Sequence, residues 1–408
     1  MYDAFVGAGE AHASLSVGAA GRQAFINLPA RPHGPRIADG PFHGTMRAIA
    51  YLAVFAWLTA RYGRAVAQHH GIGLGTQIRQ QLHLIFRDGI NPKIYYFLEL
   101  YRMWSADIGQ QCVMRYEIKR GLLRALHRLR PKHNGRRVSL GNKLSYADHC
   151  SRFGLPSPRL LGVGANGSLS LRVPLQAVGQ SDLFIKPEIS RGARGALWFK
   201  RIGAGQYRSI NGEVLSLEQV LKIAAQRSRR KNQLLQEALT NHPGIADFAE
   251  ESLIVFRVFT CINQRGDPVV THGMMRVLSK LEPRWHRGDE YAAAVDLATG
   301  ALGSMCGDKS YGPADWYDTH PVTGAQVRGR IIQDWAGIRD LAIAGHHAFI
   351  QRMLLGWDVA LTPNGPVLIE ANAYPDTEFL QRVHRQPIGE SKLGDLLAYH
   401  IARLSAVG

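Results

Sequence analysis

The chain has 408 residues, of which 46% are hydrophobic and 20% are charged, and its formal net charge is +17. These fractions exclude a wholly disordered chain, and the length is sufficient for two or three domains. The four cysteines are scattered and form no CxxC pair, which argues against a structural zinc site and for reduced thiols. The first residues lack the basic segment and apolar core of a secretory signal, so we expect a cytoplasmic protein.

Residues 1–140 are the most basic part of the chain, with 19 Lys and Arg against 7 Asp and Glu, and we expect them to be mostly helical. Residues 14–44 are rich in proline and are expected to be irregular. The apolar run 48–60 is shorter than the roughly 20 residues of a spanning helix, so it predicts a core helix or an interfacial one. Residues 111–130 predict a basic amphipathic helix ended by Pro131. The positive charge suits an anionic partner or a peripheral membrane surface, or is simply solvated.

From Gly141 onwards, apolar runs typical of strands alternate with helical segments, which predicts an α+β fold with largely antiparallel neighbours. We expect two subdomains, residues 141–240 and residues 241–408. The expected strands are 183–188, 196–202, 234–239, 253–262, 269–278 and 291–297, and a helix is expected at 334–353.

Two apolar runs around Pro363–Gly365 predict a β-hairpin, because Asn-Gly supplies the positive φ of a tight turn. Asp358 lies on its first strand, and Glu370 and Asn372 share one face of its second. A three-residue loop would pair Asp358 with Glu370 across the strands. Two carboxylates and an amide oxygen would then converge, and such oxygen ligands suit Mg²⁺. The alternative is a pair of solvent-exposed edge residues.

The stretch DLFIKPEISRGARG places Lys186 at the end of a strand, before a loop that contains Ser190, Arg191, Gly192, Ala193, Arg194 and Gly195. Glycines let backbone N–H groups approach an anion, and a lysine is a point charge suited to a phosphate oxygen. The loop does not follow the GxxxxGK[ST] pattern, so it is not a P-loop. A basic hairpin turn is the alternative. Lys143 opens a further helix, which Asn142 is expected to cap.

In this order, these motifs resemble the ATP-grasp superfamily, and most closely its sugar-transfer-associated branch, over roughly residues 141–400. The residues that carry the resemblance are Asn142-Lys143, Lys186-Pro187 with Ser190 to Gly195, Gln236-Glu237 with Asn241-His242-Pro243, Arg257, VDLATG (295–300), His320-Pro321 and GWDVALTPNGPVLIEAN (356–372). Many ATP-grasp ligases begin with a Rossmann-like subdomain, whereas residues 1–140 are expected to be helical here, so the substrate class does not carry over.

The resemblance implies an ATP site between two α+β subdomains and assigns a role to each motif. Nucleotide contacts are implied for Lys143 and Lys186 at the α- and β-phosphates, for residues 190–195 closing over the phosphates, for Gln236, Glu237, Ala238 and Leu239 at the hinge near adenine, and for His242 on the ribose side. The implied ligands of one or two Mg²⁺ ions are Asp358, Glu370 and Asn372. Arg257 and Arg276 would stabilise charge at the γ-phosphate, although both could instead form salt bridges on a sheet face.

The implied function is an ATP- and Mg²⁺-dependent ligase that joins a small-molecule carboxylate to an amine through an acyl phosphate. A phosphotransferase on the same fold is one alternative. The other is a non-catalytic basic module that binds nucleic acid or anionic lipid through residues 1–140.

Overall fold

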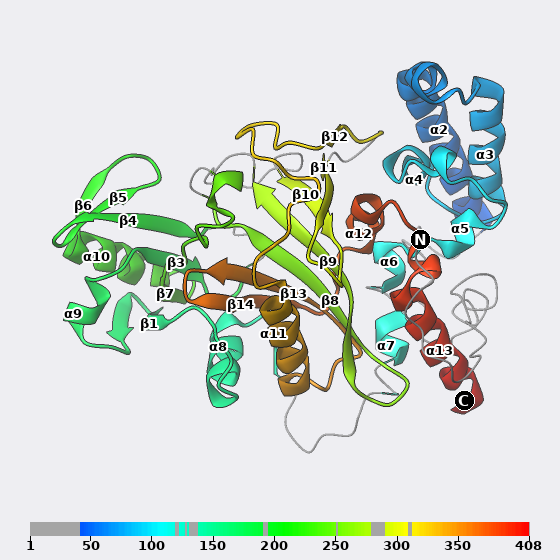
Figure 1. The fold of residues 1–408 in the computed structure, drawn as a ribbon. Coiled ribbons are helices and arrows are strands. Elements are labelled where there is room, and N and C mark those ends of the chain that lie inside the picture. The colour runs from blue at the N-terminus through cyan, green and yellow to red at the C-terminus, as the bar shows by residue number, and fades with distance from the viewer. Residues whose placement is uncertain are drawn as a thin grey trace.

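The computed structural model describes residues 41–118, 122–126, 129, 138–190, 195–249, 252–278, 290–308 and 312–407. Two seven-stranded sheets lie in sequence after a helical N-terminal region (Figure 1). Within both sheets, neighbouring strands pair antiparallel. The predicted α+β class and the helical N-terminal region are confirmed.

The first sheet has the order β2-β1-β7-β3-β4-β5-β6. Its strands are β1 (Leu160–Ala165), β2 (Ser168–Leu171), β3 (Leu183–Pro187), β4 (Leu197–Gly203), β5 (Gln206–Ser209), β6 (Val214–Ser216) and β7 (Gln233–Glu237). The helix α10 (Leu217–Ser228) begins at a capping box between Ser216 and Gln219 and covers one face. Val220 and Ala224 of α10 pack there against Ile185 and Leu235 of the sheet. Side chains alternate along a strand, so Lys186 and Gln236, which follow these two residues, point to the opposite face, toward the second sheet.

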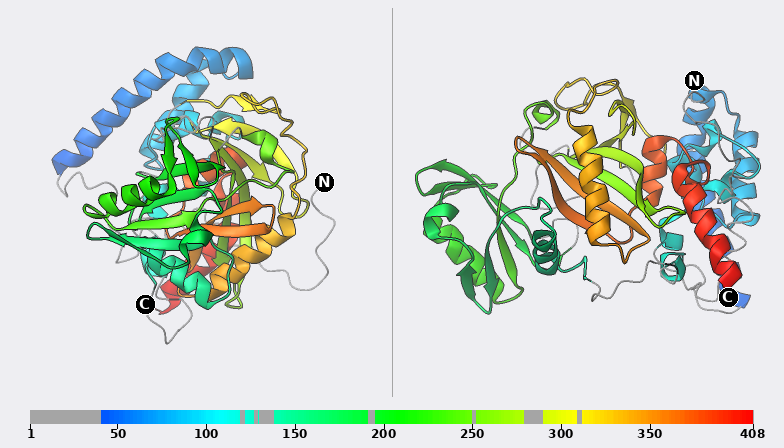
Figure 2. Two further views of the ribbon diagram at one scale, coloured as in Figure 1. Left: turned by 90° about the vertical axis from the view of Figure 1, so that its left-hand side faces the viewer. Right: turned by 60° about the horizontal axis from the view of Figure 1, so that its bottom comes forward.

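The second sheet has the order β12-β11-β10-β9-β8-β13-β14. Its strands are β8 (Val255–Ile262), β9 (Pro268–Leu278), β10 (Glu290–Val295), β11 (Leu302–Gly307), β12 (Trp316–Tyr317), β13 (Leu354–Thr362) and β14 (Gly365–Asn372). The helix α11 (Trp335–Ala348) packs on one face, where Trp335 and Ile338 share a core with Trp357. The helices α12 (Thr377–His384) and α13 (Lys392–Val407) follow β14 and lie toward the N-terminal region (Figures 1 and 2).

The remaining helices of the described residues are mostly short. They are α2 (Pro41–His70), α3 (Leu74–Phe86), α4 (Lys93–Phe97), η1 (Leu100–Arg102), α5 (Ile108–Gln111), α6 (Arg115–Glu117), α7 (Leu123–Leu126), α8 (Lys143–Arg152), α9 (Leu175–Val178), η3 (Ala246–Phe248) and η4 (Ile388–Glu390). None of the helices within the described ranges has the length and apolar character needed to cross a bilayer.

Two expectations for the N-terminal third need correction. The segment 14–44 is not irregular to its end, because α2 already begins at Pro41; residues 14–40 lie outside the described residues. The single helix expected over 111–130 is also wrong, because Cys112 and Met114 are extended and separate α5 from α6. Met114, Ile118, Leu122 and Leu126 are nevertheless buried, so the pattern identified core residues but not a continuous helix.

The N-terminal helices share one hydrophobic core with the far end of the chain. Tyr95 and Leu123 belong to the same buried cluster as Phe259 of β8, Phe379 of α12 and Leu397 of α13. Residues before position 127 thus complete the face of the second sheet that α11 leaves uncovered. The division of the chain at residues 140 and 240 stays a prediction.

Candidate functional site

The β13–β14 hairpin brings two carboxylates together, because Asp358 pairs directly with Glu370. The predicted three-residue loop is wrong, because Thr362 pairs with Gly365 and leaves a two-residue turn. A bulge between the Val359–Leu368 and Asp358–Glu370 pairs restores the register.

The bulge also changes which residues of β14 share a face: simple alternation along the strand predicts that Leu368 lies on the face of Glu370 and Asn372. Leu368 instead joins the core beneath α11, so it does not share a face with Glu370. The extra residue of a bulge reverses the alternation of side chains along its strand. Asp358 and Glu370 therefore point away from α11, into the region between the two sheets and the N-terminal helices.

Two arginines from neighbouring strands surround Asp358. Arg257 of β8 makes a bidentate pair with it, through Nε to Oδ1 and through Nη2 to Oδ2 at 3.0 Å. Arg276 of β9 lies 3.8 Å from Asp358 Oδ1 and makes its own bidentate pair with Glu290, with an Nη2–Oε2 distance of 2.8 Å. Asn372 donates its amide to Asp358 Oδ2 at 3.4 Å. The salt-bridge alternative considered for both arginines is therefore what the structure contains, and it places both beside the hairpin carboxylates.

The two hairpin carboxylates have opposite pKa shifts. Burial favours the neutral form of Asp358, but the Arg257 and Arg276 charges outweigh it and lower the pKa. Burial raises the pKa of Glu370, and the neighbouring charge of Asp358 raises it further. Asp358 is thus ionised between two arginines, whereas the charge that acts most strongly on the partly buried Glu370 is that of another carboxylate. A cation bound at Glu370 would relieve this repulsion.

Two lysines stand near Glu370 from the side of the first sheet. The α8 helix is capped by Asn142, as predicted, and positions Lys143, whose Nζ donates to the Ser190 carbonyl at 2.8 Å. Lys186, on β3, is 7% exposed. Burial, with the Lys143 charge adding to it and Glu370 opposing it, lowers the pKa of Lys186 to about 8. The pKa of Lys143 is also lowered by burial and raised in part by Glu370.

The loop that follows β3 is described only at its ends. Ser190 accepts from Lys143, and the Gly195 carbonyl accepts from Arg227 at 2.7 Å. The predicted contacts of Arg191, Gly192, Ala193 and Arg194 lie outside the described residues. Glu188 accepts hydrogen bonds from the Asn142 and Asn232 side-chain amides and forms no salt bridge with Lys186 in the described part of the chain, so it holds the start of α8 against the end of β3.

The segment after β7 leads from the first sheet to the second. Gln236 lies on the face turned away from α10, is 3% exposed and donates to the Pro158 carbonyl at 3.3 Å, while its Oε1 has no partner among the described residues. Glu237 and Ala238 donate their backbone N–H groups to Arg159 and Asp182. Leu239 is half-buried at the exit of this segment.

His242 ties the end of the same connection to the hairpin. Its backbone N–H donates to the Leu361 carbonyl at 2.8 Å, and its ring Nδ1 accepts from the Gly244 N–H at 3.0 Å. The connecting segment is therefore anchored to the strand that carries Asp358.

No metal cluster of three or more His, Cys, Asp or Glu side chains occurs in the part of the chain that the structure describes. The hairpin instead offers two carboxylates and one amide. Since Asn372 donates its NH₂ group to Asp358, its amide oxygen stays available as an acceptor.

The sequence of this chain matches a known family. The profile of the sugar-transfer associated ATP-grasp family matches residues 124–390. The chain belongs to this family. No curated protein sequence matches it significantly.

Solved structures similar to this ATP-grasp chain include ligases. The VanG D-Ala:D-Ser ligase from Enterococcus faecalis has 14% identity and a TM-score of 0.37, and the match covers 65% of this chain and 61% of that one. The D-alanine–D-alanine ligase from Bacillus anthracis, complexed with ATP, has 9% identity and a TM-score of 0.36, covering 66% and 69%. An L-amino acid ligase from Bacillus licheniformis has 12% identity and a TM-score of 0.33, covering 57% and 40%. The match spans less than two thirds of the VanG chain and of the L-amino acid ligase.

Sequence reasoning missed Glu290, the partner of Arg276 on β10. Strand alternation could have found it, because Ala292 pairs with Arg276 and Glu290, two residues before Ala292, lies on the same face of β10.

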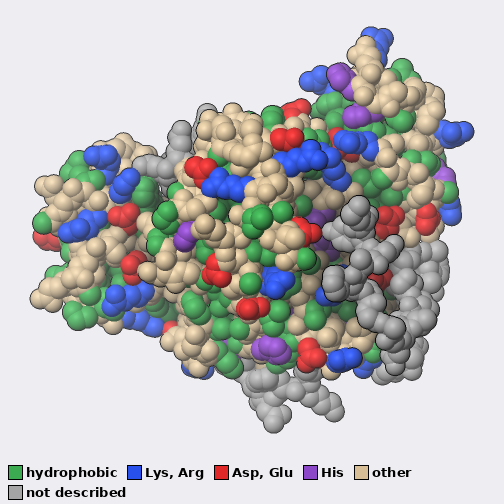
Figure 3. Space-filling view, viewed as in Figure 1, with side chains coloured by type: hydrophobic (Ala, Val, Ile, Leu, Met, Phe, Trp, Pro, Cys, Tyr) green, Lys and Arg blue, Asp and Glu red, His purple; other side chains and the backbone are tan. Residues whose placement is uncertain are grey.

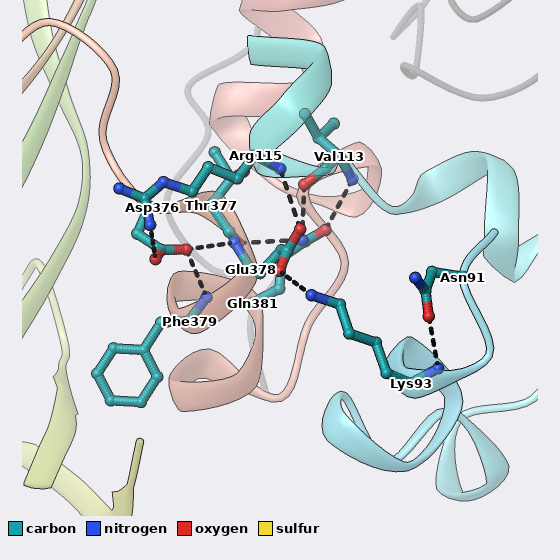
Figure 4. Close-up of polar contacts among 9 residues, drawn as sticks. All are labelled: Asn91, Lys93, Val113, Arg115, Asp376, Thr377, Glu378, Phe379 and Gln381. Carbon is teal, nitrogen blue, oxygen red and sulfur yellow. Dashed lines mark hydrogen bonds and ion pairs between the residues drawn. The ribbon is translucent and has the colours of Figure 1, made fainter. Parts of the chain in front are cut away.

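It also missed the contact between α12 and the N-terminal region, which lies directly after the hairpin (Figure 4). Asp376 caps α12 and pairs with Arg115 at 3.1 Å, and Glu378 pairs with Lys93 at 3.5 Å. The helix cap was visible in the Asp-Thr-Glu sequence, but its partners, more than 250 positions earlier, were not.

Proposed function

We propose that this chain is an ATP- and Mg²⁺-dependent carboxylate–amine ligase that forms an amide or peptide bond through an acyl phosphate. The observation that carries the proposal is that the buried Lys186 and the partly buried Lys143 lie near Glu370, which is paired with the buried Asp358 on the other sheet. Such a pairing is suited to a phosphate chain whose oxygens bind lysines at one end and a metal ion at the other.

The proposed phosphate contacts are Lys143 and Lys186, with residues 190–195 covering the phosphates. Lys186 fits this role because its ammonium group is buried, has a lowered pKa, and finds no salt-bridge carboxylate among the described residues. A bound anion would offset the desolvation of that charge.

The proposed nucleoside contacts are Gln236, the backbone of Glu237 to Leu239, and His242. Gln236 fits because its buried Oε1 accepts no hydrogen bond from a described residue, and the amino group of adenine is a donor. The two subdomains proposed to hold the nucleotide are residues 141–240 and residues 241–408, with this segment as the hinge between them.

The proposed Mg²⁺ ligands are Asp358, Glu370 and Asn372, and their oxygen donors match the preference of a hard dication. The raised pKa of Glu370 is the observation that fits, because a dication would favour its ionised form. When bound, the metal would neutralise charge on the phosphates of the nucleotide.

Arg257 and Arg276 are proposed to stabilise the charge that develops during transfer of the γ-phosphoryl group. Asp358 holds the Arg257 guanidinium in a fixed direction, and Glu290 does the same for Arg276, so neither arginine needs to reorganise during the reaction. In the proposed reaction the substrate carboxylate oxygen attacks the γ-phosphorus and ADP leaves. The amine nitrogen then attacks the acyl carbon, phosphate leaves with the C–O bond electrons, and the amine loses a proton.

The test is a screen of small carboxylates and amines with Mg·ATP, followed by mass spectrometry of the products. We expect ADP, phosphate and an amide in equal amounts, and no product with Lys186→Met. A stable phosphoester that persists in the presence of amine would assign the phosphotransferase alternative, and AMP would exclude both.

A further inference from the structure

The helical pair α2 and α3 presents an apolar surface to solvent on the side away from the core. Thr59 and Gly63 of α2 contact Gln81 and Gln77 of α3, which sets the two helices antiparallel. Leu58 and Leu84 face inward and are buried. The outer face carries large exposed hydrophobic side chains: Ile49, Trp57, Ile78 and Phe86, which are 61%, 54%, 37% and 66% exposed.

Within each helix, the two exposed residues are eight positions apart, so with steps of 100° per residue they point in similar directions. Ile49 and Trp57 point away from the buried Leu58, and Phe86 points away from the glutamines of α3 that contact α2. Small side chains fill the space between Ile49 and Trp57, since Ala53 and Ala56 are also exposed. In α3 three glutamines are buried beside Leu84 and Ile85, whereas Ile78 and Phe86 are exposed.

The charge on this pair has one sign. Residues 40–87 contain five arginines and no Asp or Glu. Arg64 and Arg79 are exposed beside the apolar face. At the upper right of Figure 3, over the junction of α2 and α3, basic side chains border hydrophobic ones. The N-terminal half of α2 projects beyond the other elements at the edge of the molecule (Figure 2, left).

We infer that this face binds the surface of an anionic phospholipid membrane, with α2 and α3 lying in the plane of the interface. An interfacial helix needs exposed apolar side chains flanked by Lys or Arg, and anionic headgroups supply the opposite charge. A second copy of this chain fits less well, because two acid-free surfaces of the same sign would face each other. The inference does not depend on the proposed ligase reaction.

The test is flotation of the full chain with vesicles of phosphatidylcholine alone and of phosphatidylcholine mixed with phosphatidylglycerol. We expect the chain to float only with the mixed vesicles, and to be released as the salt rises above about 0.15 M. Trp57→Glu with Phe86→Glu should weaken vesicle binding at least about tenfold, because it places charge on the face that would enter the membrane and removes apolar area from it. Val322→Glu is the matched control, since Val322 is exposed on a different part of the molecule, and should bind like the parent.

A chain that stays in the soluble fraction with mixed vesicles overturns the inference, as does a doubly substituted chain that still floats. If the double variant misfolds, Arg64→Glu with Arg79→Glu tests the same face through exposed positions and should also abolish flotation. Light scattering tests whether a second copy of the chain binds this face instead. A dimer that dissociates on the same substitutions, with no vesicle binding, would assign the face to a second copy.

Discussion

Lys186 is a cation held in a place that disfavours its charge. Its pKa is about 8 in the folded chain, against 10.5 for an unperturbed lysine, because of burial first and Lys143 second. Between these two pH values the unfolded chain binds a proton that the folded chain does not. The free energy of unfolding therefore rises as pH rises through this window, and the full penalty applies below pH 8.

Replacing Lys186 with Met should remove that penalty. We expect Lys186→Met to raise the free energy of unfolding by about 2–3 kcal/mol below pH 8 and to lose this advantage toward pH 10.5. Urea unfolding at pH 7 and pH 10 measures both values. The same variant should lose ATP binding in calorimetry, and the parent should take up a proton on binding ATP near pH 8. A variant that is destabilised at pH 7 would show that Lys186 has a structural anion that we have not identified.

The two hairpin carboxylates should respond oppositely to loss of charge. Glu370→Gln relieves the repulsion from Asp358, so in EDTA the variant should be at least as stable as the parent. Asp358→Asn leaves the buried Arg257 guanidinium without its carboxylate and should cost about 3–5 kcal/mol.

Thermal melts in EDTA measure both variants, and each serves as the control for the other. If Glu370→Gln also retains the parent's Mg²⁺ dependence of turnover, Glu370 is not a metal ligand. If it melts well below the parent, the residue has a structural partner instead.

The hairpin depends on one backbone position. Gly365 has a φ of +99°, a region that other residues avoid, and a Cβ there would meet no heavy atom within 4 Å. Gly365→Ala should therefore cost about 1–2 kcal/mol through backbone strain alone. Gly303→Ala is a suitable control, because Gly303 lies on β11 with an ordinary φ and only van der Waals contacts at 3.8 Å. Equal melting temperatures for the two variants would refute the strain argument.

The elements that the sequence predicted well are those with long apolar runs or a strong turn signal. β3, β7, β8, β9 and β10 lie where they were expected, within a few residues at each end. β2 and β6 were missed, because they are short and mostly exposed and so carry no apolar alternation. The bulge before Glu370 was missed because an extra strand residue has no marker in sequence.

The residues of the candidate site could be predicted from the sequence, but the salt bridges between its arginines and carboxylates could not. Residue types and order indicated Lys143, Lys186, Asp358 and Glu370. Which arginine pairs with which carboxylate depends on strand order: β8 lies beside β13, so Arg257 meets Asp358 from 101 positions away. Only tertiary structure assigns such a pair.

Gln381 joins the N-terminal region to the element that follows the hairpin. It is 2% exposed, accepts from the Val113 and Ile388 N–H groups, and donates to the Val113 carbonyl at 3.0 Å (Figure 4). Gln381→Ala would leave the buried Val113 groups without partners and should lower the free energy of unfolding by about 2–3 kcal/mol. Chemical denaturation measures the loss, and Gln386→Ala, at an exposed position, should change it by less than about 0.5 kcal/mol. Equal losses in the two variants would contradict the role given to Gln381.

The N-terminal helices share a core with α12 and α13, so during synthesis they must wait for these last helices before they can pack. Val113 leaves the ribosome 268 residues before Gln381, its hydrogen-bond partner, and at ordinary translation rates that delay is roughly 15–50 s. Throughout this interval the apolar side chains of residues 90–126 lack α12 and α13, against which they finally pack. The nascent chain therefore offers a long-lived hydrophobic segment near its start, which is a substrate for chaperones and a site of aggregation when expression outpaces them.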